Sequence, residues 1–117
     1  MFIFEVNGIP VPQQQIRFSK RSGAIYNPST KDIHQLQWQV RPYAPQEPLS
    51  GPVEMHLTFY LPIPKSTSRK AYIHMLNEVI LPTKKPDFDN LAYLVTNALK
   101  GIAYIDDAQV TDCVIRK

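Results

Sequence analysis

The sequence predicts a single domain of the α/β class (α+β type), residues 1–117, with a mixed sheet of four to five strands and about three helices. Apolar and polar residues alternate strictly over residues 53–61, which is typical of a strand with one buried face. Over residues 91–99, apolar residues instead recur at helical spacing. A chain of 117 residues, 44% of them apolar, is long enough to bury one core.

The N-terminal part of the chain predicts a strand, a hairpin and a helix, in that order. Residues 1–6 read as a first strand and end at an Asn-Gly turn signal. Residues 16–18 and 24–26 flank a short basic turn and predict two paired strands. The Asn-Pro-Ser-Thr sequence from residue 27 predicts the start of a helix that continues to Val40, before three closely spaced prolines.

The middle of the chain predicts one strand and one amphipathic helix. The alternating strand over residues 53–61 ends at two prolines. Residues 66–79 then favour a helix with Ser66 or Ser68 as its cap. The apolar stripe of this helix is formed by Tyr72, Met75, Leu76 and Val79.

The C-terminal part predicts a third helix over residues 89–100 and a last strand over residues 110–115. Asp89 or Asn90 is suited to cap the helix, because a short side-chain oxygen can accept a hydrogen bond from a free amide of the first turn. Gly101 is suited to the left-handed turn that commonly follows a helix.

Composition and charge exclude several classes of protein. No apolar run reaches the roughly 18 residues needed to span a bilayer, and no signal peptide is recognisable. The single cysteine, Cys113, cannot form an internal disulfide, which favours a cytoplasmic location. The net charge of +3 is compatible with a polyanionic partner such as DNA.

Two acidic pairs stand out in this basic chain: Asp87 with Asp89, and Asp106 with Asp107. Carboxylates in such proximity repel one another unless a cation lies between them, and a hard divalent cation prefers oxygen ligands. The predicted helix between the pairs is roughly 18 Å long, so the chain must turn back after Gly101 for the pairs to meet. Alternatively, the first pair belongs to a helix cap and a proline turn, and the second to a surface turn.

Residues 84–110 contain K-P-D-F-D-N-L, N-A-L-K-G-I-A-Y and D-D-A-Q-V, motifs that resemble the RusA family of Holliday-junction resolvases. The resemblance implies a RusA-like homodimeric endonuclease that depends on Mg²⁺, with Mn²⁺ as the alternative metal, and cuts branched DNA during recombination and repair. It implies catalytic roles for Asp87, Asp89 and Asp107, and a metal site formed by these residues with Asp106. It also suggests prophage origin.

Two positions depart from the family pattern. Where the family has a catalytic lysine in D-N-L-x-K, this chain has Tyr93, and the acid of the family's D-A-L is Asn97. Lys84, Lys85 and Lys100 are candidates to replace the missing charge. The alternatives are therefore a weak or inactive protein that binds branched DNA, and a general branched-DNA or flap nuclease.

Five basic residues are the predicted contacts with the four-way DNA junction. Arg17, Lys20 and Arg21 belong to the predicted hairpin, and Lys84 and Lys85 precede the first acidic pair. Lysine and arginine bind phosphates without reading the base sequence. For the hairpin, the alternative is a solvated turn without a partner.

Overall fold

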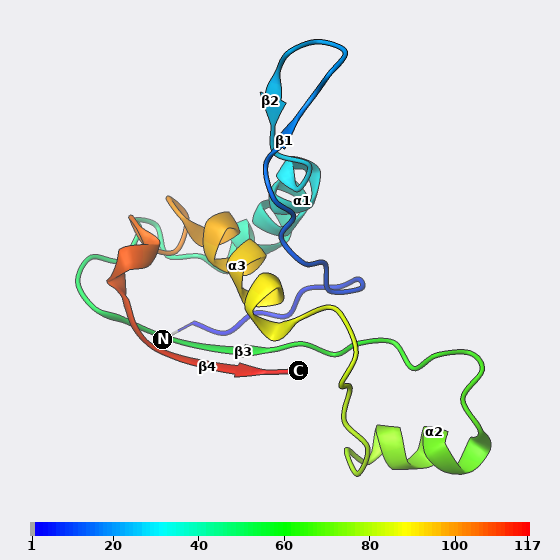
Figure 1. Ribbon diagram of the computed structural model, residues 1–117. Coiled ribbons are helices and arrows are strands. Elements are labelled where there is room, and N and C mark those ends of the chain that lie inside the picture. Colours follow the sequence, from blue (N-terminus) through cyan, green and yellow to red (C-terminus); the bar gives the residue numbers. More distant parts are fainter. Residues whose placement is uncertain (1) are drawn as a thin grey trace.

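A computed structural model describes residues 2–117 and confirms the mixed α/β class, with three α-helices and four strands in this range (Figure 1). In chain order the elements are β1 (Arg17–Phe18), β2 (Ile25–Tyr26), α1 (Thr30–Val40), β3 (Val53–Thr58), α2 (Arg69–Leu76), α3 (Phe88–Leu99) and β4 (Val110–Arg116). Two short 3-10 helices, η1 (Arg41–Tyr43) and η2 (Asp107–Gln109), complete the structure. None of the described helices is long and apolar enough to cross a membrane.

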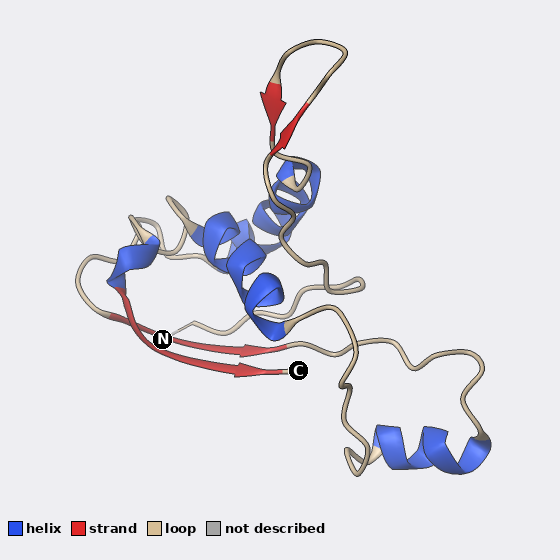
Figure 2. Cartoon of the chain, in the orientation of Figure 1, coloured by secondary structure: helices blue, strands red, loops and turns tan. Residues whose placement is uncertain are grey.

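The four strands form two separate two-stranded sheets rather than one mixed sheet (Figure 2). β1 and β2 are antiparallel and form the predicted hairpin, whereas β3 and β4 are parallel, with Met55 opposite Cys113. The strand predicted over residues 1–6 is wrong for residues 2–6, which are not in a strand, and Met1 lies outside the described residues. Phe2 and Phe4 instead stack on each other and pack against the core, so their burial does not require strand pairing.

The core lies between α1, α3 and the β3–β4 sheet. It is made mainly of aliphatic side chains with one tyrosine: Leu36, Val40, Met55, Leu94, Val95, Ala98, Leu99, Ala103 and Tyr104. Ser29, just before α1, is the one fully buried polar residue of the described chain, and its Oγ accepts a hydrogen bond of 2.8 Å from the backbone N–H of Gln14. The N-terminal segment is thereby fixed to the start of α1.

Helix α2 projects from this core at the end of two long loops (Figure 1). The predicted helix is confirmed, and its cap is Ser68, whose Oγ accepts a hydrogen bond from the backbone N–H of Ala71. None of its residues is fully buried, and within residues 2–117 three members of the predicted apolar stripe stay exposed: Tyr72, Leu76 and Val79. An ion pair of 2.6 Å between Arg116 and Glu78 connects the base of this arm to β4.

Helix α3 begins at Phe88, directly after the loop of residues 77–87 that follows α2. Its N-cap position is Asp87, two residues before the predicted Asp89, because Asp89 already lies within the first helical turn. The helix ends at Leu99, and Gly101 follows with a φ of +74°, which confirms the predicted left-handed turn. One side of α3 is fully buried, and this side fixes the orientation of the acidic residues at both of its ends.

Candidate functional site

The first acidic pair lies at the N-terminal end of α3. Asp87 has an extended backbone at the N-cap position, and Asp89 follows in the first turn. Both side chains are exposed, and Asp89 Oδ1 accepts a hydrogen bond of 3.0 Å from the backbone N–H of Asn90. The free amides of a helix N-terminus attract negative charge, which partly offsets the repulsion between the two carboxylates.

Two distant parts of the chain hold the loop that leads to this pair. Lys117 Nζ donates hydrogen bonds to the carbonyl oxygens of Lys84 (2.8 Å) and Pro86 (3.0 Å). From the other side, the backbone N–H of Gln13 donates to the carbonyl oxygen of Asn90 at 2.9 Å. A surface hollow lies between these segments, lined by Pro10, Pro12, Gln13, Lys85, Pro86, Asp87 and Asn90. The first acidic pair therefore borders an open, partly basic surface.

The second acidic pair lies beside Lys100, just beyond the C-terminal end of α3. Lys100 Nζ is 3.5 Å from Oδ1 of Asp106 and 3.5 Å from Oδ1 of Asp107. A hydrogen bond from Asp107 and the nearby ammonium group together lower the pKa of Asp106. In turn, the negative charge of Asp107, followed by that of Asp106, raises the pKa of Lys100. A cation of the same chain thus already neutralises part of this pair's charge.

Gln109 fixes the turn that carries Asp106 and Asp107. Its Oε1 accepts hydrogen bonds from the backbone N–H groups of Ile105 and Asp106, both at 2.9 Å. Its Nε2 donates to the carbonyl oxygens of Leu49 (2.8 Å) and Gly51 (2.9 Å). The sequence pattern D-x-x-Q is a capping-box signal from which this role of Gln109 is recognisable.

Tyr104 fixes the same region from inside the core. Its side chain is 1% exposed, and its hydroxyl donates a hydrogen bond of 2.7 Å to the carbonyl oxygen of Thr96. Burial, followed by the charge of Asp107, raises the pKa of its hydroxyl. The segment from Gly101 to Tyr104 therefore packs as a tight turn against the end of α3.

The two acidic pairs lie at opposite ends of α3. Asp87 precedes the first residue of this helix, Lys100 follows its last residue, and twelve residues at 1.5 Å each make about 18 Å. The chain does turn back, but it does so as β4, after the second acidic pair rather than before it. In residues 2–117, no three His, Cys, Asp or Glu side chains come close enough to hold a metal ion. Within one chain the two acidic pairs therefore remain two separate groups of carboxylates.

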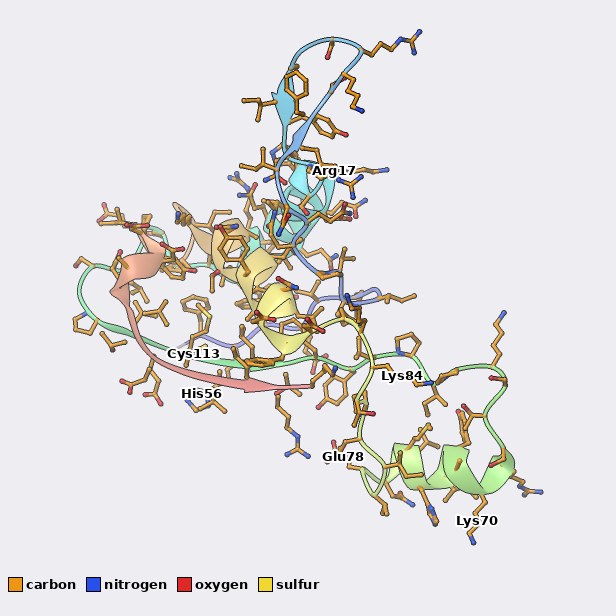
Figure 3. The ribbon with its side chains drawn as sticks, viewed as in Figure 1. Arg17, His56, Lys70, Glu78, Lys84 and Cys113 are labelled. Carbon is orange, nitrogen blue, oxygen red and sulfur yellow. The ribbon has the colours of Figure 1, made fainter. Side chains whose placement is uncertain are left out.

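The predicted DNA contacts occupy two separate surfaces. Arg17, Lys20 and Arg21 are exposed on the hairpin, which protrudes from the core (Figure 3). Lys84 and Lys85 are exposed in the loop before α3, beside Asp87. Within the described chain none of the five takes part in an ion pair, because those present involve His56, Lys100 and Arg116.

Over residues 7–117 the sequence matches the family of the endodeoxyribonuclease RusA. The chain belongs to the RusA family. It is also 34% identical over 120 residues to the uncharacterized protein YqaN of Bacillus subtilis (strain 168), and the alignment covers 97% of this chain and 84% of that protein. No solved structure matches the chain. The resemblance drawn from the motifs is confirmed, and RusA membership indicates a nuclease of the Holliday-junction resolvase type.

Tyr93, which stands where the RusA motif pattern implies a lysine, is open to solvent. The Tyr93 side chain is 54% exposed, and it shares one face of α3 with Asp89, Asn97 and Lys100. Asn97 Nδ2 donates a hydrogen bond of 3.3 Å to Gln13 Oε1, so this second departure from the RusA pattern links α3 to the N-terminal segment. No local sequence signal predicts this contact of Gln13, because 84 residues separate it from Asn97.

Proposed function

We propose that this protein is a magnesium-dependent endodeoxyribonuclease that hydrolyses phosphodiester bonds in Holliday junctions, with Mn²⁺ as a possible substitute. The observation that carries this proposal is the RusA match over residues 7–117, which includes both acidic pairs. In this proposal Asp87, Asp89 and Asp107 are the catalytic carboxylates, and Asp106 joins them as a metal ligand. Such an enzyme serves DNA recombination and repair in the cytoplasm, and prophage origin is part of the same hypothesis.

The proposed substrate requires two cuts, placed symmetrically across the junction. A homodimer with two-fold symmetry supplies two equivalent sites and suits this geometry. Arg17, Lys20 and Arg21 of the hairpin then bind phosphates of one DNA arm, and Lys84 and Lys85 bind phosphates near the cutting site. Their exposure and their lack of ion-pair partners within the described chain support these roles.

A cleavage assay tests the function directly. End-labelled four-way junctions, flaps, forks and linear duplexes are incubated with the protein and either Mg²⁺ or Mn²⁺. Paired nicks in opposite strands of the junction, with the duplex intact, are the expected result. Equal cutting of flaps, forks and junctions would identify a general branched-DNA nuclease instead, and no cutting with either metal would contradict the nuclease function.

A salt titration tests the hairpin. The logarithm of junction affinity is expected to fall with the logarithm of salt concentration, with a slope of about −0.9 for each phosphate neutralised. The double variant Lys20→Glu/Arg21→Glu should reduce this slope and weaken binding to all junction sequences alike. The variant Lys31→Glu/Arg41→Glu, with two exposed basic residues of α1 and η1, is a matched control for net charge. If the salt-dependence slopes of the two variants are identical, the hairpin is a solvated turn that does not contact DNA.

The second candidate function is a protein that binds junctions and cuts them weakly or not at all. The exposed Tyr93, at the position of the family lysine, favours this candidate because a phenol with a reference pKa of about 10 brings no positive charge. Tight junction binding without nicking, in Mg²⁺ and in Mn²⁺, would identify it.

A further inference from the structure

The β1–β2 hairpin is a projection whose base and tip are both held by hydrogen bonds (Figure 1). At its base, the backbone N–H of Gln14 donates to the buried Oγ of Ser29, at the start of α1. At its tip, the backbone N–H of Ser19 donates to the carbonyl oxygen of Ala24 at 2.8 Å. Gly23, also at the tip, has a φ of +71°, which glycine adopts without strain. The hairpin therefore holds its side chains in a fixed arrangement away from the core.

The strand register gives this hairpin two different faces. In an antiparallel pair, opposite residues lie on the same face, and successive residues alternate between the faces. Phe18 is opposite Ile25, so these two form an apolar face, whereas Arg17 and Tyr26 lie on the other. Phe18 is 63% exposed and Ile25 is 75% exposed, and neither packs against the core. The preceding Ile16 is exposed as well, so an apolar surface of the hairpin is available to another molecule.

The charges along this part of the chain are all positive. Residues 6–31 contain no aspartate or glutamate but four basic residues, Arg17, Lys20, Arg21 and Lys31, and none of the four takes part in an ion pair within the described chain. A polyanion complements such a surface. DNA is favoured over an anionic membrane, which offers the same charge, because the RusA match includes the hairpin. DNA also offers apolar base faces to the apolar side of the hairpin.

Base faces are accessible to an apolar side chain only where base stacking is interrupted. In a continuous duplex each base is covered on both sides, and inserting an apolar side chain costs the free energy of unstacking. Where the arms of a junction meet, continuous stacking is already broken, so this cost is smallest there. Phe18 and Ile25 have no side-chain hydrogen-bonding groups with which to read base edges in a groove. An aromatic ring, in contrast, stacks on bases of any sequence.

We propose that the β1–β2 hairpin acts as a wedge at the branch point of a DNA junction. Phe18, with Ile25 opposite it, stacks on the bases that are exposed where the arms meet. The basic residues Arg17, Lys20 and Arg21 bind the adjoining phosphates. This inference rests on the proposed junction binding and adds how a junction is distinguished from a linear duplex. The basic residues bind both kinds of DNA, whereas Phe18 gains its contact only at the branch point.

A fluorescent base tests the wedge. The analogue 2-aminopurine, whose fluorescence rises when its stacking neighbours are lost, replaces an adenine at the branch point of one four-way junction. In a second junction it replaces an adenine in the middle of an arm. Measurements are made without metal, so that the DNA stays intact. Binding of the wild-type protein, followed by the anisotropy of a separately labelled junction, should raise the fluorescence at the branch point and not in the arm.

Variants of Phe18 identify the side chain that is responsible. Phe18→Ala should abolish the rise in fluorescence and weaken junction binding by about 5–150-fold, the loss expected for one stacked base. Duplex affinity and the salt slope should stay unchanged, because no charge is removed. Phe18→Tyr keeps the ring and should keep the junction affinity. Tyr60→Ala, which removes an exposed aromatic side chain outside the hairpin, is the matched control.

Junction binding by the wild-type protein without a rise in branch-point fluorescence refutes the wedge and leaves junction binding intact. Equal losses of junction and duplex affinity in Phe18→Ala refute it as well, because Phe18 would then contact a groove or the backbone. If Phe18→Ala instead breaks a dimer in sedimentation, or abolishes binding to phosphatidylserine vesicles, the apolar face belongs to a second copy or to a membrane. A protein with no junction affinity contradicts both the wedge and the proposed function. A rise in fluorescence without nicking in Mg²⁺ supports the wedge and contradicts only the nuclease function.

Discussion

The two acidic ends of α3 differ in how firmly the fold holds them. At the C-terminal end, Lys100 lies between the carboxylates, and Gln109 makes four hydrogen bonds that fix their turn. At the N-terminal end, Asp87 makes no side-chain capping bond, and Asp89 makes only a local one. The carboxylates at the C-terminal end are thus held in a fixed turn and partly neutralised by Lys100, whereas those at the N-terminal end have no basic side chain paired with them and no long-range side-chain bond.

The largest expected effect comes from removing a carboxylate beyond the C-terminal end of α3. Asp107→Asn should lower both Mn²⁺ affinity and junction cleavage by more than about 100-fold, because even residues that only support metal ligands change affinity by about 10–100-fold. Asp112→Asn, on the exposed surface of β4, is the control and should change neither. Calorimetry and nicking rates measure the two quantities. Similar losses in both variants would show that overall charge, rather than position, is responsible.

A new cation on α3, between the two acidic pairs, should raise the rate of junction cleavage by an amount comparable to the loss in Asp107→Asn. Tyr93→Lys is expected to raise the cleavage rate by about 10²–10³-fold with little change in junction affinity, because the new charge acts mainly in the transition state. Its melting temperature should not fall, since Tyr93 is 54% exposed. Tyr60→Lys, at another exposed tyrosine, is the control. If the wild-type protein already cuts rapidly and Tyr93→Lys brings no gain, another residue supplies the positive charge that stabilises the transition state.

Removing Gln109 should release the turn that carries Asp106 and Asp107. Gln109→Ala removes four hydrogen bonds of about 0.5–1.5 kcal/mol each, so the free energy of unfolding should fall by about 2–6 kcal/mol. Metal affinity should fall by about 10–100-fold. Urea unfolding and calorimetry check these values against Gln46→Ala, which changes an exposed glutamine. An unchanged metal affinity despite lower stability would mean that the turn need not be rigid to bind.

The smallest effect is expected from removing the internal cation. The raised pKa of Lys100 means that its contribution to stability is present below its ordinary value of 10.5 and is lost as pH rises through the higher folded value. The lowered pKa of Asp106 makes its contribution present above 3.8 and lost as pH falls through the lower folded value. Lys100→Met should therefore lower the melting temperature slightly at neutral pH and not at either extreme. A difference that persists in strong acid would exclude the ion pair as its cause.

The sequence predicts well those elements whose signals are local. The strict alternation in β3, the apolar spacing of α3 and the turn at Gly101 are all confirmed, because each depends on neighbouring residues. The motifs also identify the RusA family correctly. Residues 2–6 show the limit of this approach, because Phe2 and Phe4 are partly buried against distant core side chains without strand pairing.

The arrangement of the candidate site could not be predicted in the same way. Spacing alone allows the acidic pairs to meet after Gly101, and only the packing of Tyr104 and Gln109 shows that the turn forms at the far end of α3. Gln109 contacts Leu49 and Gly51, and Gln13 contacts Asn97, across intervals with no repeating pattern. Contacts of this kind depend on the complete fold, so the residue types are predictable and their assembly is not.

The α2 arm has a consequence for the dynamics of the protein. An isolated helix of eight residues is marginal in water, and none of the residues of α2 is fully buried within the described chain. Its amide hydrogens should therefore exchange with solvent rapidly in dilute protein, while those in the middle of α3 exchange slowly at any concentration. Slower exchange in α2 at higher protein concentration would measure directly how strongly the arm is held by another molecule.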